Sequence, residues 1–195
     1  IFFPKTTVPL NIFEPRYIQM IDQCMKSNRI IGMIQPKKTG KLTSPDLHEV
    51  GCAGKIISFN ETDDGRYIVI LNGICRFKIK EEIKNENLFR ECNVKYEDYY
   101  NDLKNDVEEI KFSDLRLIFQ NFKGLLKKQG FDIDWKEIEK QSLDQTINTL
   151  SMASPFSLEE KQILLESKNL SLRKEKLEEI LKTYIVDNFN NRTLQ

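Results

Sequence analysis

The sequence is poor in the residues that build metal centres and redox sites. It contains one histidine, His48, and four cysteines, none of them spaced as Cys-x-x-Cys. Zinc sites and redox-active dithiols need such ligands at close spacing. We therefore expect no metal site and no cofactor in this chain.

An excess of charge of either sign is also missing. The 30 Lys and Arg residues balance the 30 Asp and Glu residues, so the formal net charge is zero. Nucleic-acid binding relies on a basic surface that neutralises phosphates. The composition argues against nucleic acid as the main partner and leaves a local basic patch open.

Long apolar runs are absent as well. No run approaches eighteen residues, roughly what a transmembrane helix requires, so none is predicted. The start, IFFPKTTVP, lacks the charged and long apolar regions of a signal peptide. It also lacks a starting methionine, so we expect the chain to begin inside a longer natural sequence. The cysteines lie among apolar residues, which favours buried, reduced thiols in a cytoplasmic protein: Cys24, Cys52, Cys75 and Cys92.

Motifs for catalysis are incomplete. GKLT at 40–43 resembles the end of a phosphate-binding loop, but the glycine that the motif needs five residues before Gly40 is replaced by Gln35. A serine or cysteine nucleophile needs a nearby base, and His48 lies in a polar segment. A Ser-Lys pair stays open by residue count alone. The acidic cluster at 61–64 is interpreted as a solvated turn, with a weak metal site at Asp63 and Asp64 as the alternative.

The first hundred residues have the pattern of short β-strands. Asp64-Gly65 indicates a hairpin turn, and Asn72-Gly73 indicates either a second turn or a bulge. We expect Arg76 to be an exposed strand residue or to pair with an acid of the 61–64 turn. Strands with glycine-marked bends predict a small, partly closed barrel. The polar segment 36–49 is predicted to be a long, mobile surface loop.

One helix interrupts this pattern after the stretch LNIFEPRY at 10–17. Pro15 suits the first helical position and Glu14 the cap, where its charge favours the positive end of the helix dipole. Phe13 is placed to pack on Ile18 as a hydrophobic staple. Apolar residues at helical spacing extend the predicted helix over about 15–27.

From about residue 111 the pattern becomes helical. Apolar stripes, possible capping boxes beginning at Asp134, Ser142 and Ser157, and a glycine stop at Gly130 predict a bundle of four or five helices. The polar, acidic segment 99–110 separates the two patterns. We expect an α+β protein with a β-rich domain at 1–105 and a helical bundle at 106–195.

Four segments together resemble one known family: 9–22, 30–36, 48–79 and 147–167. They are similar to stand-alone proteins built on the N-terminal, substrate-binding domain of Lon proteases, whose members usually open with a further strand. The resemblance implies a PUA-like β-barrel followed by an α-helical bundle. It also implies the recognition part of Lon without the ATPase and Ser-Lys peptidase parts, and so a protein that is not an enzyme.

The resemblance implies binding to exposed segments of unfolded polypeptide, as an adaptor or a holdase, with a Lon-type protease as a further partner. Such ligands are held by a sheet edge or an apolar groove. We expect the site between the helix start and the barrel, with 36–49 as its rim. Its predicted lining residues, each of which also suits a core position, are Phe13, Tyr17, Ile34 and Leu47.

Two other functions stay open at this point. PUA-like barrels also occur in RNA-associated proteins, and a basic patch would consist of Arg29, Lys37, Lys38 and Lys41. Salt-sensitive RNA binding is its signature. A cryptic hydrolase is the third hypothesis.

Overall fold

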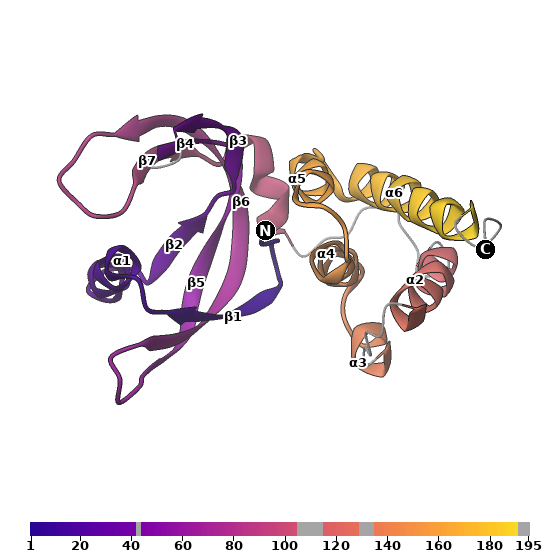
Figure 1. Cartoon of the computed structure of the whole chain (residues 1–195), viewed down its shortest axis with the longest axis horizontal. Coiled ribbons are helices and arrows are strands. Elements are labelled where there is room, and N and C mark those ends of the chain that lie inside the picture. Colours follow the sequence, from indigo (N-terminus) through magenta and orange to yellow (C-terminus); the bar gives the residue numbers. More distant parts are fainter. Residues whose placement is uncertain (42–43, 105–114, 129–134, 191–195) are drawn as a thin grey trace. The chain divides into compact units, whose positions relative to one another are not determined.

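A computed structural model of the protein describes residues 1–41, 44–104, 115–128 and 135–190. The chain separates into two compact units, Ile1–Lys104 and Asn105–Gln195. The first is built mainly of strands and the second of helices (Figure 1). The predicted α+β class, a β-barrel-type half followed by a helical half, is confirmed.

An antiparallel sheet forms most of the N-terminal unit. Its strands follow the order β1-β6-β5-β2, with β7 also paired to β6, and β3 and β4 form a separate two-stranded sheet. One helix and one 3-10 helix accompany them. The bounds are β1 Thr7–Ile12, α1 Pro15–Met25, β2 Ile30–Met33, β3 Pro36–Lys41, β4 Ser44–Leu47, β5 Val50–Glu61, β6 Tyr67–Ile83, β7 Glu91–Lys95 and η1 Glu97–Leu103.

The long strand β6 organises this sheet. One edge pairs with β5, and the other pairs first with β1 and then with β7. The pairing with β5 shifts twice, leaving Ile57 of β5 and Ile74 of β6 as extra residues. Asn72-Gly73 therefore lies in a bulged strand and is not a turn, because β6 continues through it.

Two expectations for the N-terminal unit concern segment 36–49 and the end of α1. Residues 36–49 are not a structureless loop, since β3 and β4 pair as a hairpin. The helix α1 ends at Met25, close to the predicted end at about residue 27. Arg29 takes a positive φ of 60° and donates its N–H to the Cys24 carbonyl, which turns the chain into β2. An apolar pattern at helical spacing gives no warning of such a turn.

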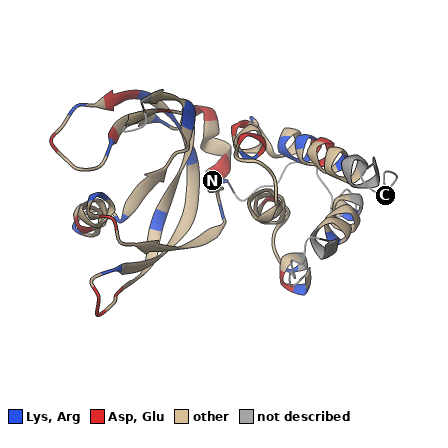
Figure 2. Ribbon diagram, viewed as in Figure 1, with Lys and Arg blue, Asp and Glu red and all other residues tan. Residues whose placement is uncertain are grey.

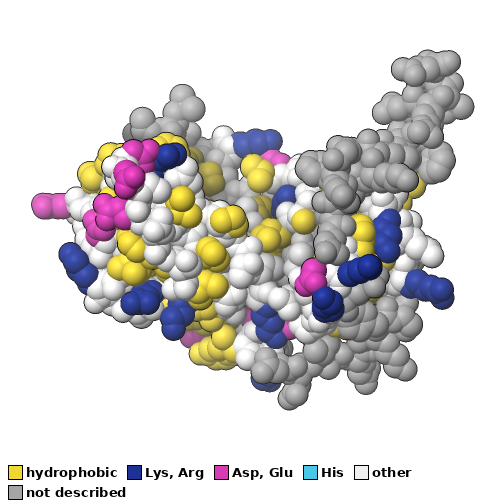
Figure 3. Space-filling view, turned by 90° about the horizontal axis from the view of Figure 1, so that it is seen from below, with side chains coloured by type: hydrophobic (Ala, Val, Ile, Leu, Met, Phe, Trp, Pro, Cys, Tyr) yellow, Lys and Arg dark blue, Asp and Glu magenta, His cyan; other side chains and the backbone are white. Residues whose placement is uncertain are grey.

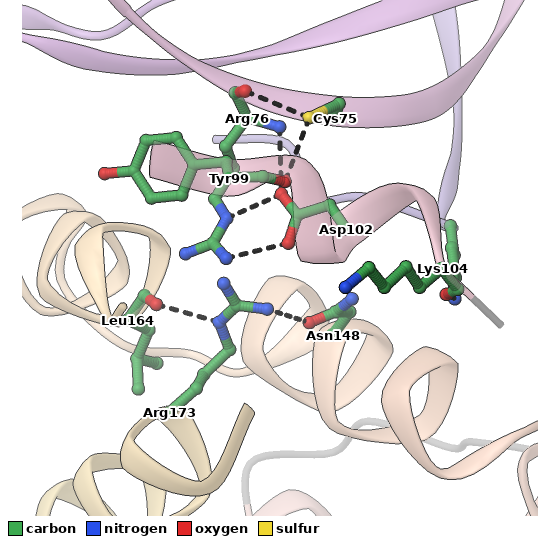
Figure 4. Close-up of polar contacts among 9 residues, drawn as sticks. Cys75, Arg76, Tyr99, Asp102, Lys104, Asn148, Leu164 and Arg173 are labelled. Atoms are coloured by element: carbon green, nitrogen blue, oxygen red, sulfur yellow. Dashed lines mark hydrogen bonds and ion pairs between the residues drawn. The ribbon is translucent and has the colours of Figure 1, made fainter. Parts of the chain in front are cut away.

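Arg76 is neither exposed nor paired with the 61–64 turn. Its side chain is 3% exposed and forms two hydrogen bonds, of 2.8 and 2.7 Å, to the two carboxylate oxygens of Asp102 in η1 (Figure 4). The Tyr99 ring lies 4.3 Å from its guanidinium carbon. At the turn, Arg66 pairs with Asp64 instead and lowers the pKa of that carboxyl to about 2.

The C-terminal unit contains five helices in its described residues. They are α2 Arg116–Lys128, α3 Trp135–Glu139, α4 Leu143–Ala153, α5 Leu158–Glu166 and α6 Leu170–Asn190. Apolar side chains from α2, α4, α5 and α6 form the core, including Phe122, Ile147, Leu164 and Leu177. Buried Arg173 donates to the Leu164 carbonyl and the Asn148 side chain (Figure 4).

The predicted caps have different outcomes. The box at Ser157 is confirmed: Glu160 donates its N–H to the Ser157 hydroxyl and accepts from the Ser157 N–H. Ser142 caps α4 without a side-chain bond to its backbone. The predictions at Asp134 and Gly130, and residues 105–110 of the segment 99–110, fall on positions outside the described residues.

Burial suppresses thiol reactivity in this chain. Cys24, Cys52 and Cys75 are buried and Cys92 is half-buried, all as free thiols. Burial raises the pKa of Cys75 to about 11 and also raises those of Cys24 and Cys92. In the ranges described, no helix combines the length and apolar character needed to cross a membrane.

Candidate functional site

The segment that leads into α1 presents a large apolar side chain to solvent. Phe13 is 63% exposed, so the expected staple does not bury it. Pro15 occupies the start of the helix as predicted. Glu14 makes no side-chain cap and pairs with Arg16 at 2.7 Å, and the Arg16 guanidinium carbon lies 4.6 Å from the centre of the Tyr17 ring. This helix start therefore exposes the apolar ring of Phe13 beside the Glu14–Arg16 ion pair, whose charges cancel.

The opposite face of α1 is anchored to the sheet. Ile21 and Cys24 are buried, and the Tyr67 hydroxyl donates to Asp22 at 3.0 Å. That hydrogen bond raises the pKa of Tyr67. Tyr67 in turn contacts the Phe59 ring edge-to-face, with ring centres 5.0 Å apart. These contacts hold α1, which carries Tyr17 and begins two residues after Phe13, against the sheet.

Residues 84–90, here named the bridging loop, connect β6 to β7 and reach α1 (Figure 1). The Leu88 N–H donates to the Gln19 side chain at 2.9 Å, and the Gln23 amide donates to Asn87 at 3.3 Å. Leu88 itself is 62% exposed. Leu88 is not among the residues predicted from sequence, because no local pattern indicates a contact with a helix that lies 69 residues away.

The far end of the bridging loop is fixed to β4. Arg90 donates to the Pro45 carbonyl at 2.7 Å and binds both carboxylate oxygens of Glu82. The hydrogen bonds from Arg90 lower the pKa of Glu82. The bridging loop therefore spans from α1 to the β3–β4 hairpin, held by polar contacts at both ends.

Ile34 and Leu47 lie at the base of that hairpin. Ile34 packs over Gly51, where an added Cβ would lie 2.9 Å from its side chain. Leu47 pairs with Pro36, and the His48 N–H donates to the Gln35 carbonyl. Both apolar side chains are half-buried. The predicted residues thus form two pairs, one at α1 and one at the hairpin base, and the bridging loop runs from one element to the other.

A second apolar surface covers the outer face of the sheet. Along β6, Val69 and Leu71 point into the core, and Ile68 and Ile70 point outward and are exposed. The bulged Ile57 of β5 is 57% exposed. Seen from below, apolar side chains form a band across the N-terminal unit (Figure 3). Monomeric proteins rarely expose large contiguous apolar patches without an interaction role.

A family model describes most of this chain. The model of the ATP-dependent protease La (LON) substrate-binding domain matches residues 1–183. The chain belongs to the Lon substrate-binding domain family. The resemblance noted in the sequence is therefore confirmed.

Relatives of this family domain are found within longer proteins. A Lon protease of Desulfosudis oleivorans is 27% identical over 188 residues, covering 91% of this chain and 22% of its own length. A Lon protease of Malacoplasma penetrans is 28% identical, covering 91% and 23%. The chain thus spans about a fifth of the length of the curated relatives that it matches.

Solved Lon N-terminal domains share the fold. A Lon N-terminal domain protein from Xanthomonas campestris has a TM-score of 0.63 at 18% identity, covering 93% of this chain and 92% of its own. The N-terminal domain of a Mycobacterium avium complex Lon protease has a TM-score of 0.60 at 16% identity, covering 96% and 93%.

In this Lon-family domain the predicted basic residues do not form one patch. Lys37 and Lys38 are successive residues of β3, so they point to opposite faces, and Lys41 ends that strand. Arg29 lies in the turn between α1 and β2. Acidic residues are interleaved with basic ones over the unit (Figure 2). Glu49 has its pKa lowered first by a hydrogen bond from Lys78 and also by Lys37. Nothing in the described ranges supports an RNA-binding surface.

Groups that would bind a metal ion are not gathered in the described part of the Lon-like domain. No three or more His, Cys, Asp or Glu side chains there are arranged to hold a cation. The acidic turn is satisfied internally, since Asp64 accepts from Thr62 and Arg66.

Proposed function

We propose that this protein binds exposed segments of unfolded polypeptide through its N-terminal unit, without catalysing a reaction. The observation that carries the proposal is the match of residues 1–183 to the Lon substrate-binding domain. The exposed apolar side chains Phe13 and Leu88 support it, because apolar segments are what an unfolded chain exposes.

The proposed contact surface combines α1, the bridging loop and the hairpin base. Phe13 and Leu88 supply exposed apolar anchors, with Tyr17 beside Phe13. Ile34 and Leu47 contribute the half-buried floor at the hairpin base. Polar contacts at both ends of the bridging loop lower the entropy cost of ordering these anchors on binding.

A titration of the purified protein tests the proposal. The probes are labelled, reduced and carboxymethylated α-lactalbumin, which cannot refold, and a labelled single-stranded RNA, each at low and physiological salt. We expect saturable polypeptide binding that persists at physiological salt, because salt screens the attraction between charges and does not weaken apolar contacts. Absence of polypeptide binding contradicts the proposal, and RNA binding that collapses with salt would assign the function to the basic residues.

Variants of the exposed anchors sharpen this test. Phe13→Ser and Leu88→Ser should each weaken polypeptide binding about fivefold, on the order of 1 kcal/mol for a partly buried apolar side chain. Leu103→Ser, at an apolar residue of η1 that is 55% exposed, is the matched control and should bind as the parent does. Equal losses in all three variants would show that the α1 surface has no special role.

An adaptor and a holdase differ in the fate of the bound polypeptide. As an adaptor, the protein would accelerate degradation of that polypeptide by a Lon-type protease. As a holdase, it would suppress aggregation and leave the degradation rate unchanged or lower it. Degradation of the carboxymethylated protein by a purified Lon-type protease, with and without this chain, separates the two.

A further inference from the structure

The strand β5 has an open edge. β6 covers one side of β5 along its length, but on the other side β2 pairs only with residues 52–55. Beyond Ile56, whose N–H donates to the Arg29 carbonyl, no described strand pairs with residues 57–61 on that side. An unpaired edge is a template for another extended chain.

Hydrogen-bond alternation shows which backbone groups face that edge. Thr62 donates its N–H to Arg66, opposite it across the hairpin, at 2.9 Å. In an antiparallel pair, hydrogen-bonded and non-bonded positions alternate. Asn60 and Ser58 therefore bond to β6, and Phe59 and Glu61 direct their N–H and C=O groups away from it.

The pairing of β6 with β1, on the opposite side of the sheet, is consistent with this assignment of hydrogen-bonded positions. Ile70 faces Ser58 on one side and Pro9 of β1 on the other. If the backbone N–H and C=O of Ile70 both bond to Ser58, Ile70 forms no hydrogen bond with β1. This agrees with Pro9 opposite it, because proline has no backbone N–H to donate. Pro9 then lies on the outward-facing set of β1, where it blunts that edge. The β5 edge carries no such proline.

Side chains along the β5 edge form a charge pattern. Residues 57–60, Ile-Ser-Phe-Asn, are uncharged, and both Ile57 and Phe59 are exposed. Arg29 and Lys55 lie at one end and Glu61 at the other. Within the described residues, none of these three charged side chains forms an ion pair.

We propose that the open β5 edge binds an extended polypeptide segment by strand addition. The inference rests on the proposed function and names how the substrate is held. The segment runs antiparallel to β5, as both existing partners do. It has four uncharged residues opposite residues 57–60, with apolar side chains alternating, and a basic residue at its N-terminal end opposite Glu61. An acidic residue at its C-terminal end lies next to Lys55 and Arg29.

The first test separates backbone from side chain at Phe59. Phe59→Pro and Phe59→Val both remove the ring, but only the proline removes the outward N–H. The fold should tolerate it, as the sheet tolerates Pro9 at the equivalent outward position. We expect the labelled peptide Lys-Thr-Val-Thr-Val-Asp to bind the proline variant about fivefold more weakly than the valine variant, the effect of one lost hydrogen bond.

The second test uses the parent protein, so it holds even if Phe59→Pro does not fold. The first valine of the peptide lies opposite Phe59 and donates to its carbonyl, whereas the second threonine points its N–H to solvent. N-methylation of that valine should weaken binding at least fivefold, and N-methylation of that threonine should not. Equal effects of the two methyl groups would overturn strand addition at this register.

The outcomes distinguish this inference from the proposed function. If the carboxymethylated protein binds the parent and both Phe59 variants equally, strand addition is wrong and polypeptide binding stands. If it binds none of them, the proposed function itself fails. If the protein forms a dimer that only Phe59→Pro abolishes, in sedimentation analysis, the occupant is a second copy and the inference is overturned.

Discussion

Arg76 and Asp102 determine how η1 is held against the sheet. The two side chains are 3% and 8% exposed, and Asp102 also accepts the Arg76 backbone N–H at 3.0 Å. The Tyr99 ring covers the guanidinium, and the Tyr99 carbonyl accepts from the Cys75 thiol. A buried charge pair costs desolvation energy, which this dense set of hydrogen bonds offsets.

Removing one member of this pair should be far worse than removing both. We expect Asp102→Leu to lower the free energy of unfolding by about 3–5 kcal/mol, because it leaves the arginine charge buried alone. The double variant Arg76→Met with Asp102→Leu should recover much of that loss. Urea unfolding followed by circular dichroism measures both. Equal destabilisation by the single and the double variant would show that the charge is not the cause.

The sequence signals for Arg76 were misleading for a physical reason. A charged residue in a strand is usually solvated, and the nearest acids in sequence lie in the 61–64 turn. Its true partner is 26 residues away in a segment with no strand or α-helix pattern. Local rules describe Pro15 and Ser157 well, because helix starts are settled within one turn of the chain.

At the scale of single elements, the bulge of β6 secures the start of the chain. Gly73 accepts from the Lys5 N–H and donates to the Thr6 carbonyl, and Phe2 and Phe3 beside it are buried. A Cβ at Gly73 would lie 2.1 Å from the Phe3 carbonyl oxygen. The bulge therefore holds residues 2–6 by backbone contact, which leaves no room for a side chain.

Gly73→Ala should displace this N-terminal segment. We expect a loss of about 1–3 kcal/mol in the free energy of unfolding, from overpacking against backbone that cannot rotate away. Hydrogen exchange should show lost protection at Lys5. Gly65→Ala, at a positive φ of 78° with open space around it, is the control for strain alone. Unchanged protection at Lys5 would contradict this account.

The capping box of α5 makes the helical unit sensitive to acid. Burial alone would raise the pKa of Glu160, but hydrogen bonds from the Ser157 and Tyr184 hydroxyls outweigh it and hold the pKa below its ordinary 4.5. A carboxyl with a lowered pKa stabilises the folded state above its unfolded pKa. That contribution is lost as pH falls through the folded value.

Glu160→Gln isolates this contribution. Glutamine also suits a capping box but does not titrate. The variant should unfold at a temperature that depends less on pH below about 4.5 than the parent does. Thermal unfolding from pH 7 to pH 3 provides the comparison, and parallel pH profiles would show that Glu160 is not responsible. Glu159→Gln, at the exposed neighbouring carboxylate, is the matched control.

At the scale of the whole chain, the family and the order of its two halves could be predicted from sequence. The four segments that resemble the family are long and follow one another in the family's order. An uncertain strand or helix assignment within one segment therefore does not change the family that they indicate. The proposed site could be predicted only in part. Phe13 and Tyr17 belong to a helix start, which depends on neighbouring residues only. The positions of Leu88 and the β5 edge depend on which strands pair, and no single segment of the sequence determines that pairing.

The pairing of β1 has a consequence for the synthesis of the protein on the ribosome. Thr7 pairs with Asn72, so β1 has no partner until some 65 further residues have been made. At roughly 5–20 residues per second, that interval lasts about 3–13 seconds. During that interval of its own synthesis, the chain contains β1 as an unpaired strand segment with apolar residues. Such a segment is the kind of ligand that the protein is proposed to bind.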